Sequence, residues 1–406
     1  VWEWQAEAYV LKQQGHAHGL RCVAYAPDGR HLATGGEDGK VKLWSAQTGF
    51  CFVTFEEHQA PISAVLFAQS GRVVLSASLD GTVRAHDLGR YKCFRTLVAP
   101  GSGAQLLSLA VDAGGELVAA GALEPPEVYV WSLQTGKLLD VLPGHAGPVC
   151  AAAFAPAGQT GRLATASWDG QVKLWDVYKA KALESLEHDR DVLDVAWRPD
   201  GKQLCAACLN GNLYFWNPET AEAEGVIEGR RDVAGGRGAN DVITAKTKAA
   251  QAHFTRVTYT ADGQGVLAGG EGKYVCLYAA RTRVLVRKFQ LSLNRNYDGV
   301  LDELNSQALT DSGAAREAMD VSGSEDEDDD GGRAKRAAAA LPGATRGMGR
   351  STRAAVRCTS LAFGPAGRAW AAATPDGVLV GRREERTNDP RRREERASGH
   401  KEQQAC

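Results

Sequence analysis

The sequence has no uninterrupted apolar stretch of about 18 residues, the length that a membrane-spanning helix requires, so we expect no membrane segment. It also has no excess of charge of one sign, because 47 basic and 49 acidic side chains leave a formal net charge of −2. This balance excludes a globally basic, histone-like nucleic-acid binder and leaves only local basic faces. The first residues are not those of a signal peptide, and without an initiator methionine we expect a fragment that begins inside a structural unit.

The nine cysteines form no dense disulfide framework, and their odd number in a chain of 406 residues favours free thiols in a reducing compartment. One close pair, Cys205 and Cys208, lies in an apolar run that is typical of a strand. A zinc site needs a second pair of ligands at a suitable spacing, and the sequence offers none. We therefore expect two buried core thiols there, and neither a metal nor another cofactor.

Tryptophan recurs at intervals of roughly 41 to 45 residues, each time after an apolar residue in a short strand-like run. The series is Trp2, Trp44, Trp131, Trp175 and Trp216, with His86 in phase between the second and third and Tyr278 after a longer interval. In the same phase, a histidine opens four units, and Asp-Gly or Asn-Gly pairs between apolar runs predict tight hairpins. A period of this length is typical of the four-stranded blade of a β-propeller.

The chain contains six complete units and one partial unit. The complete units span 15–57, 58–98, 99–143, 144–186, 187–228 and 250–293, and the partial unit spans 357–380. The partial unit shows three strand patterns, and the run at 8–13 offers a fourth. Because a closed ring leaves no unpaired strand edge, we expect this run to complete the last blade. The predicted fold class is all-β, a seven-bladed propeller over residues 1–380.

Three segments lack the period. Residues 229–249 are rich in glycine and are expected to form a loop inserted between blades. Residues 300–354 contain a dense acidic run and little apolar content, which predicts a disordered linker. Residues 381–406 form a charged tail rich in Arg and Glu, and the sequence leaves open whether this is a helix, an irregular tail or an artefact of the gene model.

The recurring residues resemble the WD-repeat (WD40) family over roughly residues 1–293 and again over 355–380. The resemblance implies a hydrogen-bonded chain of His, Ser, Asp and Trp, complete only in the unit that begins at His145. Its members are His145, Ser167, Asp169 and Trp175; the incomplete sets are His16, Asp38 and Trp44 with Gly36, then His58, Ser78 and Asp80 with His86, then His188, Asn210 and Trp216 with Cys208. A hydrolase triad is the alternative, but repetition along the chain and the lack of a Gly-x-Ser-x-Gly motif favour a structural role.

Seven segments carry a closer resemblance, and the last three of them lie outside the general repeat marks. They are 1–5, 9–16, 78–85, 90–96, 228–232, 291–295 and 298–306. They resemble the periodic tryptophan protein 2 family of the small-subunit processome, whose members have two propellers followed by a helical domain; this chain resembles the second propeller alone. The resemblance implies a non-enzymatic nucleolar scaffold of the UTP-B subcomplex. Its implied partners are other WD-repeat proteins of that subcomplex and, directly or indirectly, pre-ribosomal RNA with its snoRNA particle, with no membrane and no small-molecule substrate.

Two other functions compete with this interpretation. A WD-repeat substrate receptor of a ubiquitin ligase often has Arg two residues after the Trp-Asp pair, where this chain has Tyr178. An enzyme is disfavoured because the sequence contains no metal-ligand set, P-loop or nucleophile motif.

Two further groups of residues are candidates for contact or modification. The basic pairs Arg90 with Lys92 and Arg230 with Arg231 are placed on predicted loops, where they can meet phosphates or partner proteins. Contact with protein is favoured over direct contact with RNA. Ser322 and Ser324 precede an acidic run and are candidate phosphosites, although a passive linker explains the same composition equally well.

Overall fold

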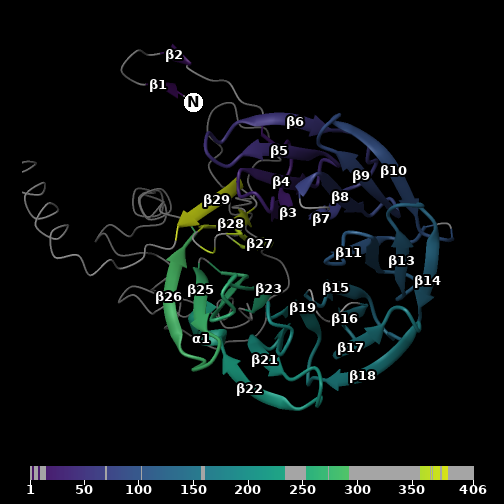
Figure 1. Cartoon of the computed structure of the whole chain (residues 1–406). Helices are drawn as coiled ribbons and strands as arrows, with labels where there is room; N and C mark the ends of the chain where they lie inside the picture. The colour runs from purple at the N-terminus through teal and green to yellow at the C-terminus, as the bar shows by residue number, and fades with distance from the viewer. Residues whose placement is uncertain are drawn as a thin grey trace, which may run out of the picture.

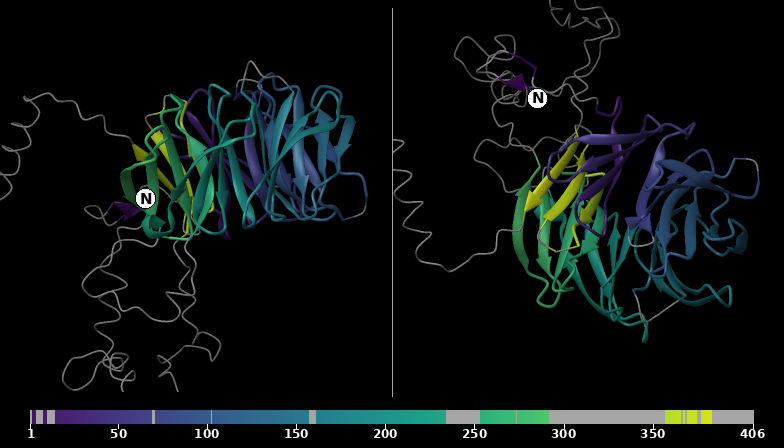
Figure 2. Two further views of the ribbon diagram at one scale, coloured as in Figure 1. Left: turned by 90° about the horizontal axis from the view of Figure 1, so that it is seen from below. Right: turned by 45° about the horizontal axis from the view of Figure 1, so that its top comes forward.

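The computed structural model describes residues 2–3, 8–9, 15–68, 71–101, 103–156, 161–233, 253–272, 274–291, 357–365, 367, 369–374 and 377–382. Apart from one two-stranded pair, these residues form seven β-sheets that stand around a central axis as the blades of a propeller (Figure 1). Seen from the side, the blades stand next to one another in a flat cylinder (Figure 2). The fold is the seven-bladed WD40 propeller that the sequence predicted. Within the described ranges, no helix has the length and apolar character needed to cross a bilayer.

Each of the first six blades has four antiparallel strands in sequence order, the first at the axis and the fourth at the rim. Blade 1 contains β3 (Leu20–Tyr25), β4 (His31–Gly36), β5 (Val41–Ser45) and β6 (Cys51–Phe55). Blade 2 contains β7 (Ile62–Ala68), β8 (Val73–Ser78), β9 (Thr82–Asp87) and β10 (Lys92–Val98). Blade 3 contains β11 (Leu106–Val111), β12 (Leu117–Ala122), β13 (Val128–Ser132) and β14 (Leu138–Leu142).

The remaining blades continue around the ring. Blade 4 contains β15 (Val149–Phe154), β16 (Arg162–Ser167), β17 (Gln171–Asp176) and β18 (Lys181–Glu187). Blade 5 contains β19 (Val192–Trp197), β20 (Leu204–Cys208), β21 (Asn212–Trp216) and β22 (Ala223–Glu228). Blade 6 contains β23 (Phe254–Tyr259), β24 (Gly265–Gly270), β25 (Tyr274–Ala279) and β26 (Leu285–Gln290), and blade 7 contains β27 (Ser360–Phe363), β28 (Ala369–Thr374) and β29 (Gly377–Arg382).

The core lies between neighbouring blades, and the composition of the strands follows from their place in it. Second strands such as β8 and β12 are buried along their whole length, so small and β-branched residues fill them on both faces. The fourth strands face solvent on one side, and β10 accordingly alternates between exposed and more buried positions. Cys205 and Cys208 are fully buried free thiols of β20, as the sequence predicted.

An irregularity of register recurs in the innermost strand of the first six blades. After the first paired residue, the next residue has no partner on the second strand, which is the pattern of a β-bulge. The six bulged residues are Arg21, Ser63, Leu107, Cys150, Leu193 and Thr255. Because a bulge redirects a side chain, these positions become the lining of the central channel described below.

Blade 7 closes the ring against blade 1 through both hydrogen bonds and packing. Thr359 Oγ1 donates to Leu20 O at 3.0 Å, and the backbone N–H of Val23 donates to Ser360 Oγ at 3.3 Å. Apolar side chains of β3, β4 and β28 form a common buried cluster next to these bonds. The two ends of the propeller therefore meet directly, although the chain between them is long.

The fourth strand predicted for blade 7 stays a prediction. Among the described residues, β2 (Ala8–Tyr9) pairs with β1 (Trp2–Glu3), and blade 7 has three strands; residues 10–13 lie outside the described ranges. The edge of β29 exposes apolar side chains, since Leu379 is 38% and Val380 is 50% exposed. An adjoining cavity of about 310 Å³ is lined by Val380, Trp44 and Gly15 among others, which provides space for a pairing segment.

If residues 8–13 pair with β29, deleting residues 1–14 exposes an apolar strand edge, and we expect aggregation or early melting. Size-exclusion chromatography with a thermal melt measures both effects. Deletion of 383–406 serves as the control, because it begins after β29 ends. If the chain without residues 1–14 stays monomeric and has the same melting temperature as the control, the predicted closure is contradicted.

The predicted inserted segments fall mostly outside the described residues. The insertion at 229–249 begins not as a loop but as a helical turn, α1 (Arg230–Val233). Asp232 of this turn binds Tyr278 and Lys288, which fixes it against blade 6. The linker at 300–354 lies outside the described ranges, as does the tail beyond β29; β29 itself continues two residues past the predicted end of the propeller at 380.

Candidate functional site

Three blades contain a hydrogen-bonded chain that runs from a turn aspartate to the third strand. In blade 4, His145 Nδ1 lies 2.9 Å from Asp169 Oδ2, and His145 Nε2 lies 2.8 Å from Thr165 Oγ1. The indole N–H of Trp175 donates to the same Thr165 oxygen at 2.8 Å. Blade 1 repeats the chain with Asp38, His16, Thr34 and Trp44, and blade 2 repeats it with Asp80, His58, Ser76 and His86. The chain ties the entrance of a blade to its second and third strands.

The hydroxyl that bonds to the histidine in this series is that of Thr165. The prediction that Ser167 takes this position between His145 and Trp175 was wrong. Ser167 is the last residue of β16, two positions further along the same face, and therefore lies at the turn. Its Oγ donates to Gly147 O at 2.8 Å and accepts the N–H of Asp169 at 3.2 Å. Ser78 holds the corresponding place in blade 2. Since the hydroxyl of Ser167 bonds to backbone and not to His145, this arrangement is not a Ser-His-Asp triad.

Blade 5 has a shortened form of the chain. The residue that corresponds to Thr165 is Ala206, which has no hydroxyl, and Trp216 Nε1 donates directly to His188 Nε2 at 3.0 Å. The Nδ1 of His188 lies 3.2 Å from Leu186 O. Asn210 donates to Tyr214 OH at 3.0 Å and, among the described bonds of this blade, makes none to His188. The predicted set is therefore only partly brought together here.

Burial controls the titration of these groups. It lowers the pKa of His145, and the hydrogen bond to Asp169 opposes this shift only in part. Burial likewise lowers the pKa of His16 and His188. For Asp169 the balance is opposite: burial raises its pKa, but the hydrogen bonds from His145 and two backbone N–H groups outweigh this, and the net pKa lies below its ordinary value.

We expect the stability of the propeller to fall as the pH drops below about 6.5, the ordinary pKa of histidine. The folded pKa of His16, His145 and His188 is lowered, so the unfolded chain takes up protons before the folded chain does. Melting temperatures measured between about pH 7.5 and pH 5 test this expectation. Burial also lowers the pKa of His86, to about 3, so four histidines contribute. The variant His145→Gln removes one of these four groups and is expected to have a weaker dependence on pH. A melting temperature that is constant over this range contradicts the expectation.

A central channel opens on the face of the propeller that carries these turns. Its mouth is a cavity of about 530 Å³, lined by the bulged residues of the inner strands and by turn residues. Trp168 stands at this mouth with 46% of its surface exposed, next to Asp169 in the chain. Arg21 and Glu37 form an exposed ion pair at 3.1 Å in the same mouth. A large aromatic side chain beside mixed charges is typical of a protein-binding surface.

One partly buried ion pair supports the channel wall between blades 5 and 6. Asp194 Oδ2 accepts the backbone N–H of Val257 at 2.7 Å, and Asp194 Oδ1 lies 3.3 Å from Arg256 Nη1. Burial raises the pKa of Asp194, and the guanidinium of Arg256 opposes that rise. The Arg256 side chain is 28% exposed toward the channel, while that of Asp194 is 10% exposed. The repeat pattern of the sequence does not reveal this pair, because the two residues come from different repeats.

The predicted contact pair Arg90 and Lys92 lies on the outer rim of blade 2, and both residues are exposed. Between them stands Tyr91, which is 51% exposed and whose ring lies 6.3 Å from that of Phe52 of blade 1. We define the rim patch as Phe50, Phe52, Arg90, Tyr91, Lys92 and Phe94; its aromatic members are all more than 40% exposed. The structure thus adds to the predicted basic pair an aromatic surface that the repeat pattern did not reveal.

The other predicted contact and modification residues are less well defined. Arg230 and Arg231 begin α1, where Arg230 is exposed. Ser322 and Ser324 lie outside the described residues.

Comparison with known proteins agrees with this architecture. The family model "WD domain, G-beta repeat" matches residues 8–45, 49–87, 136–176 and 181–217. Periodic tryptophan protein 2 homolog of Mus musculus is 46% identical over 94% of this chain and 40% of its own length. Periodic tryptophan protein 2 homolog of Dictyostelium discoideum and Periodic tryptophan protein 2 of Saccharomyces cerevisiae are each 42% identical over 94% of this chain and 41% of their own length.

The chain thus spans about two fifths of the length of the curated relatives that it matches. The match to these relatives extends over blades that the general repeat model leaves out, including the third and the sixth. It is found with proteins from a mouse, a yeast and a slime mould. The chain belongs to the periodic tryptophan protein 2 family.

Proposed function

We propose that this propeller is a non-enzymatic scaffold in ribosome biogenesis, which assembles the small-subunit processome and supports processing of the small-subunit rRNA precursor. The observation that carries the proposal is identity of 40–46% over 94% of the chain with periodic tryptophan protein 2 relatives. The place of action that follows is the nucleus, and within it the nucleolus. The partners that follow are the other WD-repeat proteins of the UTP-B subcomplex.

The chemistry of the described side chains supports a scaffold better than an enzyme. The imidazoles of His16 and His145 have both ring nitrogens in hydrogen bonds within their blades. These groups are therefore engaged in holding strands together and are not directed at a substrate. The surfaces that remain accessible, the channel mouth and the rim patch, have the mixed aromatic and charged character of protein interfaces.

Protein is the first partner that we assign to the rim patch. Exposed aromatic side chains with flanking Arg are common at the centre of protein interfaces. Bases of single-stranded RNA can also stack on such rings, with Arg90 and Lys92 at the phosphates. The patch contains two cations, a small number for an extended RNA track, so we place pre-ribosomal RNA and its snoRNA particle mainly in indirect contact through partner proteins.

Affinity purification of the tagged chain from nucleolar extract tests the proposal. We expect WD-repeat proteins of the small-subunit processome and the 5′ part of the rRNA precursor in the eluate. A double variant, Tyr91→Ala with Phe52→Ala, is expected to lose protein partners and to change its melting temperature little, because about half of each ring is exposed and neither belongs to a buried core cluster. Recovery of a cullin adaptor without rRNA precursor supports a ubiquitin ligase receptor instead and contradicts the proposal.

The candidate phosphosites extend the proposal to regulation. Phosphorylation of both Ser322 and Ser324 adds about −3 to −4 charges at neutral pH, which repels RNA and attracts basic segments of partners. Deleting residues 320–332 is therefore expected to impair particle assembly and cleavage of the rRNA precursor. Normal growth and normal processing after this deletion contradict a regulatory role and leave only a linker.

A further inference from the structure

Blade 2 differs from the other hydrogen-bonded blades at the position that holds tryptophan elsewhere. His86 occupies this position, is fully buried and stacks on Phe55 with ring centroids 4.1 Å apart. Its Nε2 lies 3.3 Å from Ser76 Oγ, where Trp44 and Trp175 present an indole N–H to the corresponding hydroxyl. Histidine at this position thus preserves the contact with the hydroxyl of the second strand, and it adds a second ring nitrogen that tryptophan lacks.

The hydrogen-bond order fixes which nitrogen of His86 carries the proton. His58 Nδ1 lies 2.8 Å from the carboxylate of Asp80 and must donate to it, so His58 Nε2 accepts the Ser76 O–H at 2.8 Å. Ser76 Oγ has then used its proton and accepts from His86 Nε2–H. The Nδ1 of His86 is left with a free lone pair, and it is buried without a hydrogen-bond partner.

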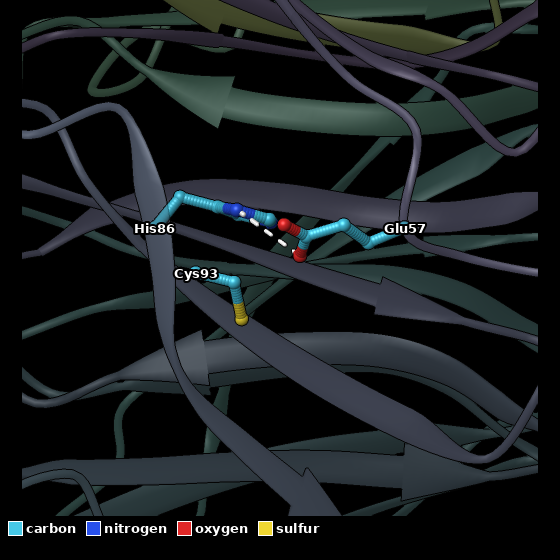
Figure 3. Close-up of side chains that lie close together, drawn as sticks. All are labelled: Glu57, His86 and Cys93. Carbon is cyan, nitrogen blue, oxygen red and sulfur yellow. Dashed lines mark ion pairs between the residues drawn. The ribbon is translucent and has the colours of Figure 1, made fainter.

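The Glu57 carboxylate faces this nitrogen and the Cys93 side chain lies beside the pair, as Figure 3 shows. Glu57 Oε2 lies 3.8 Å from His86 Nδ1, and Cys93 is the residue directly opposite His86 in the pairing of β9 with β10. The ligand atoms of Glu57, His86 and Cys93 all lie within 4.8 Å of one another. A nitrogen lone pair, a carboxylate and a thiol, three groups that can each supply a ligand to a metal ion, therefore lie next to one another in blade 2.

We propose that Glu57 Oε2, His86 Nδ1 and Cys93 Sγ bind a divalent transition metal ion, with zinc as the first choice. A set of one N, one O and one S donor suits this borderline-soft ion, and the carboxylate and thiolate together neutralise its charge. Tetrahedral zinc with ordinary bond lengths separates a nitrogen ligand from an oxygen ligand by about 3.3–3.5 Å. The 3.8 Å between His86 Nδ1 and Glu57 Oε2 must therefore shorten slightly when the ion binds. The fourth position is left for water or for a donor atom of a partner, because Glu57 stands at the surface with 37% of its side chain exposed.

Two neighbouring contacts compete with the ion, and both must weaken or break when the ion binds. Arg84 Nη1 lies 3.7 Å from Glu57 Oε2 and shares that carboxylate. The thiol of Cys93 donates to Arg95 O at 3.1 Å, and this proton must leave when the thiolate binds the metal. Binding therefore releases a proton, and a measured release per bound ion is part of the expected result.

Blade 1 provides a matched control. Cys51 is paired with Trp44 as Cys93 is paired with His86, and its Sγ makes the same kind of contact, to Val53 O at 3.4 Å. Since tryptophan offers no ligand, Cys51 has the same place in its blade without the site. The variant Cys51→Ser therefore reports the effect of removing a thiol from this position alone.

The test is a titration of the full chain with Co²⁺ and then Zn²⁺ after treatment with a chelator. We expect one ion bound with the spectrum of a tetrahedral cobalt site, including a thiolate-to-cobalt charge-transfer band that zinc abolishes. Cys93→Ser removes this band, and both it and Glu57→Gln weaken zinc binding by at least about tenfold, while Cys51→Ser binds as the unaltered chain does. Glu57→Gln is a surface substitution, so its effect can be read even if variants of His86 fold poorly.

Two results overturn the proposal. One is a cobalt spectrum of the unaltered chain without a thiolate band. The other is equal metal binding by Cys93→Ser and Cys51→Ser, which places any bound ion elsewhere in the chain.

Discussion

Replacing Asp194 by alanine is expected to lower the free energy of unfolding by about 3 kcal/mol, the lower end of the range for breaking a buried ion pair. The change removes the anion beside Arg256 and the acceptor of the Val257 N–H, both of which bridge blade 5 to blade 6. The loss stays near the lower end because the Arg256 side chain reaches the channel and is partly hydrated there. Denaturant unfolding of the purified chain measures the effect.

A conservative variant separates the two parts of this effect. Asp194→Asn keeps an oxygen for the Val257 N–H and removes only the charge, so it is expected to lose less stability than Asp194→Ala. The control Asp200→Ala removes an aspartate of the same blade whose side chain is 39% exposed and whose partner is Arg198. If Asp194→Ala unfolds at the same denaturant concentration as Asp200→Ala, the ion pair has no role in joining the blades.

Replacing Asp169 by alanine is expected to cost about 1–3 kcal/mol and to lower the melting temperature without abolishing any chemical activity. The carboxylate accepts bonds from His145, from the N–H of Ala146 and from the N–H of Gln171. Without it, these donors are left unpaired at the top of blade 4, where His145 is buried. A thermal melt of the variant beside the unaltered chain is the measurement.

Asp28→Ala is the matched control for this change. Asp28 also accepts the N–H of the residue two positions later, at 2.8 Å from Arg30 N, but it is an exposed turn residue outside any blade network. We expect the control to change the melting temperature little. Equal melting curves for Asp169→Ala and Asp28→Ala contradict the stabilising role of the hydrogen bonds that join Asp169, His145, Thr165 and Trp175 in blade 4.

The period of the sequence predicted the blades because each blade needs the same types of residue in its strands and turns. Asp-Gly and Asn-Gly pairs supply the positive φ that the hairpins need, as at Gly39, Gly81, Gly170 and Gly211. The unit boundaries read from these turns enclose the strands that the structure contains, for example β3 to β6 within 15–57. Local chemistry therefore sufficed to predict the strands and turns of the blades, although not the helical turn α1.

The site details depended on spatial neighbours that local patterns do not report. Thr165 and Ser167 share a strand face, and only the position of the strand end decides which hydroxyl meets His145. Arg256 and Asp194 are 62 residues apart and meet only because their blades are adjacent. The same holds for the rim patch, where Phe52 and Tyr91 come from neighbouring blades.

A cross-linking map of particles assembled with this chain tests the central claim most directly, namely that the propeller is a scaffold for other proteins of the small-subunit processome. The account predicts cross-links from Lys92, within the rim patch, and from Lys40, in the turn that carries Glu37 of the channel mouth, to WD-repeat proteins that co-purify with the rRNA precursor. Cross-links that run instead to a cullin adaptor, or particles that form without the chain, contradict it.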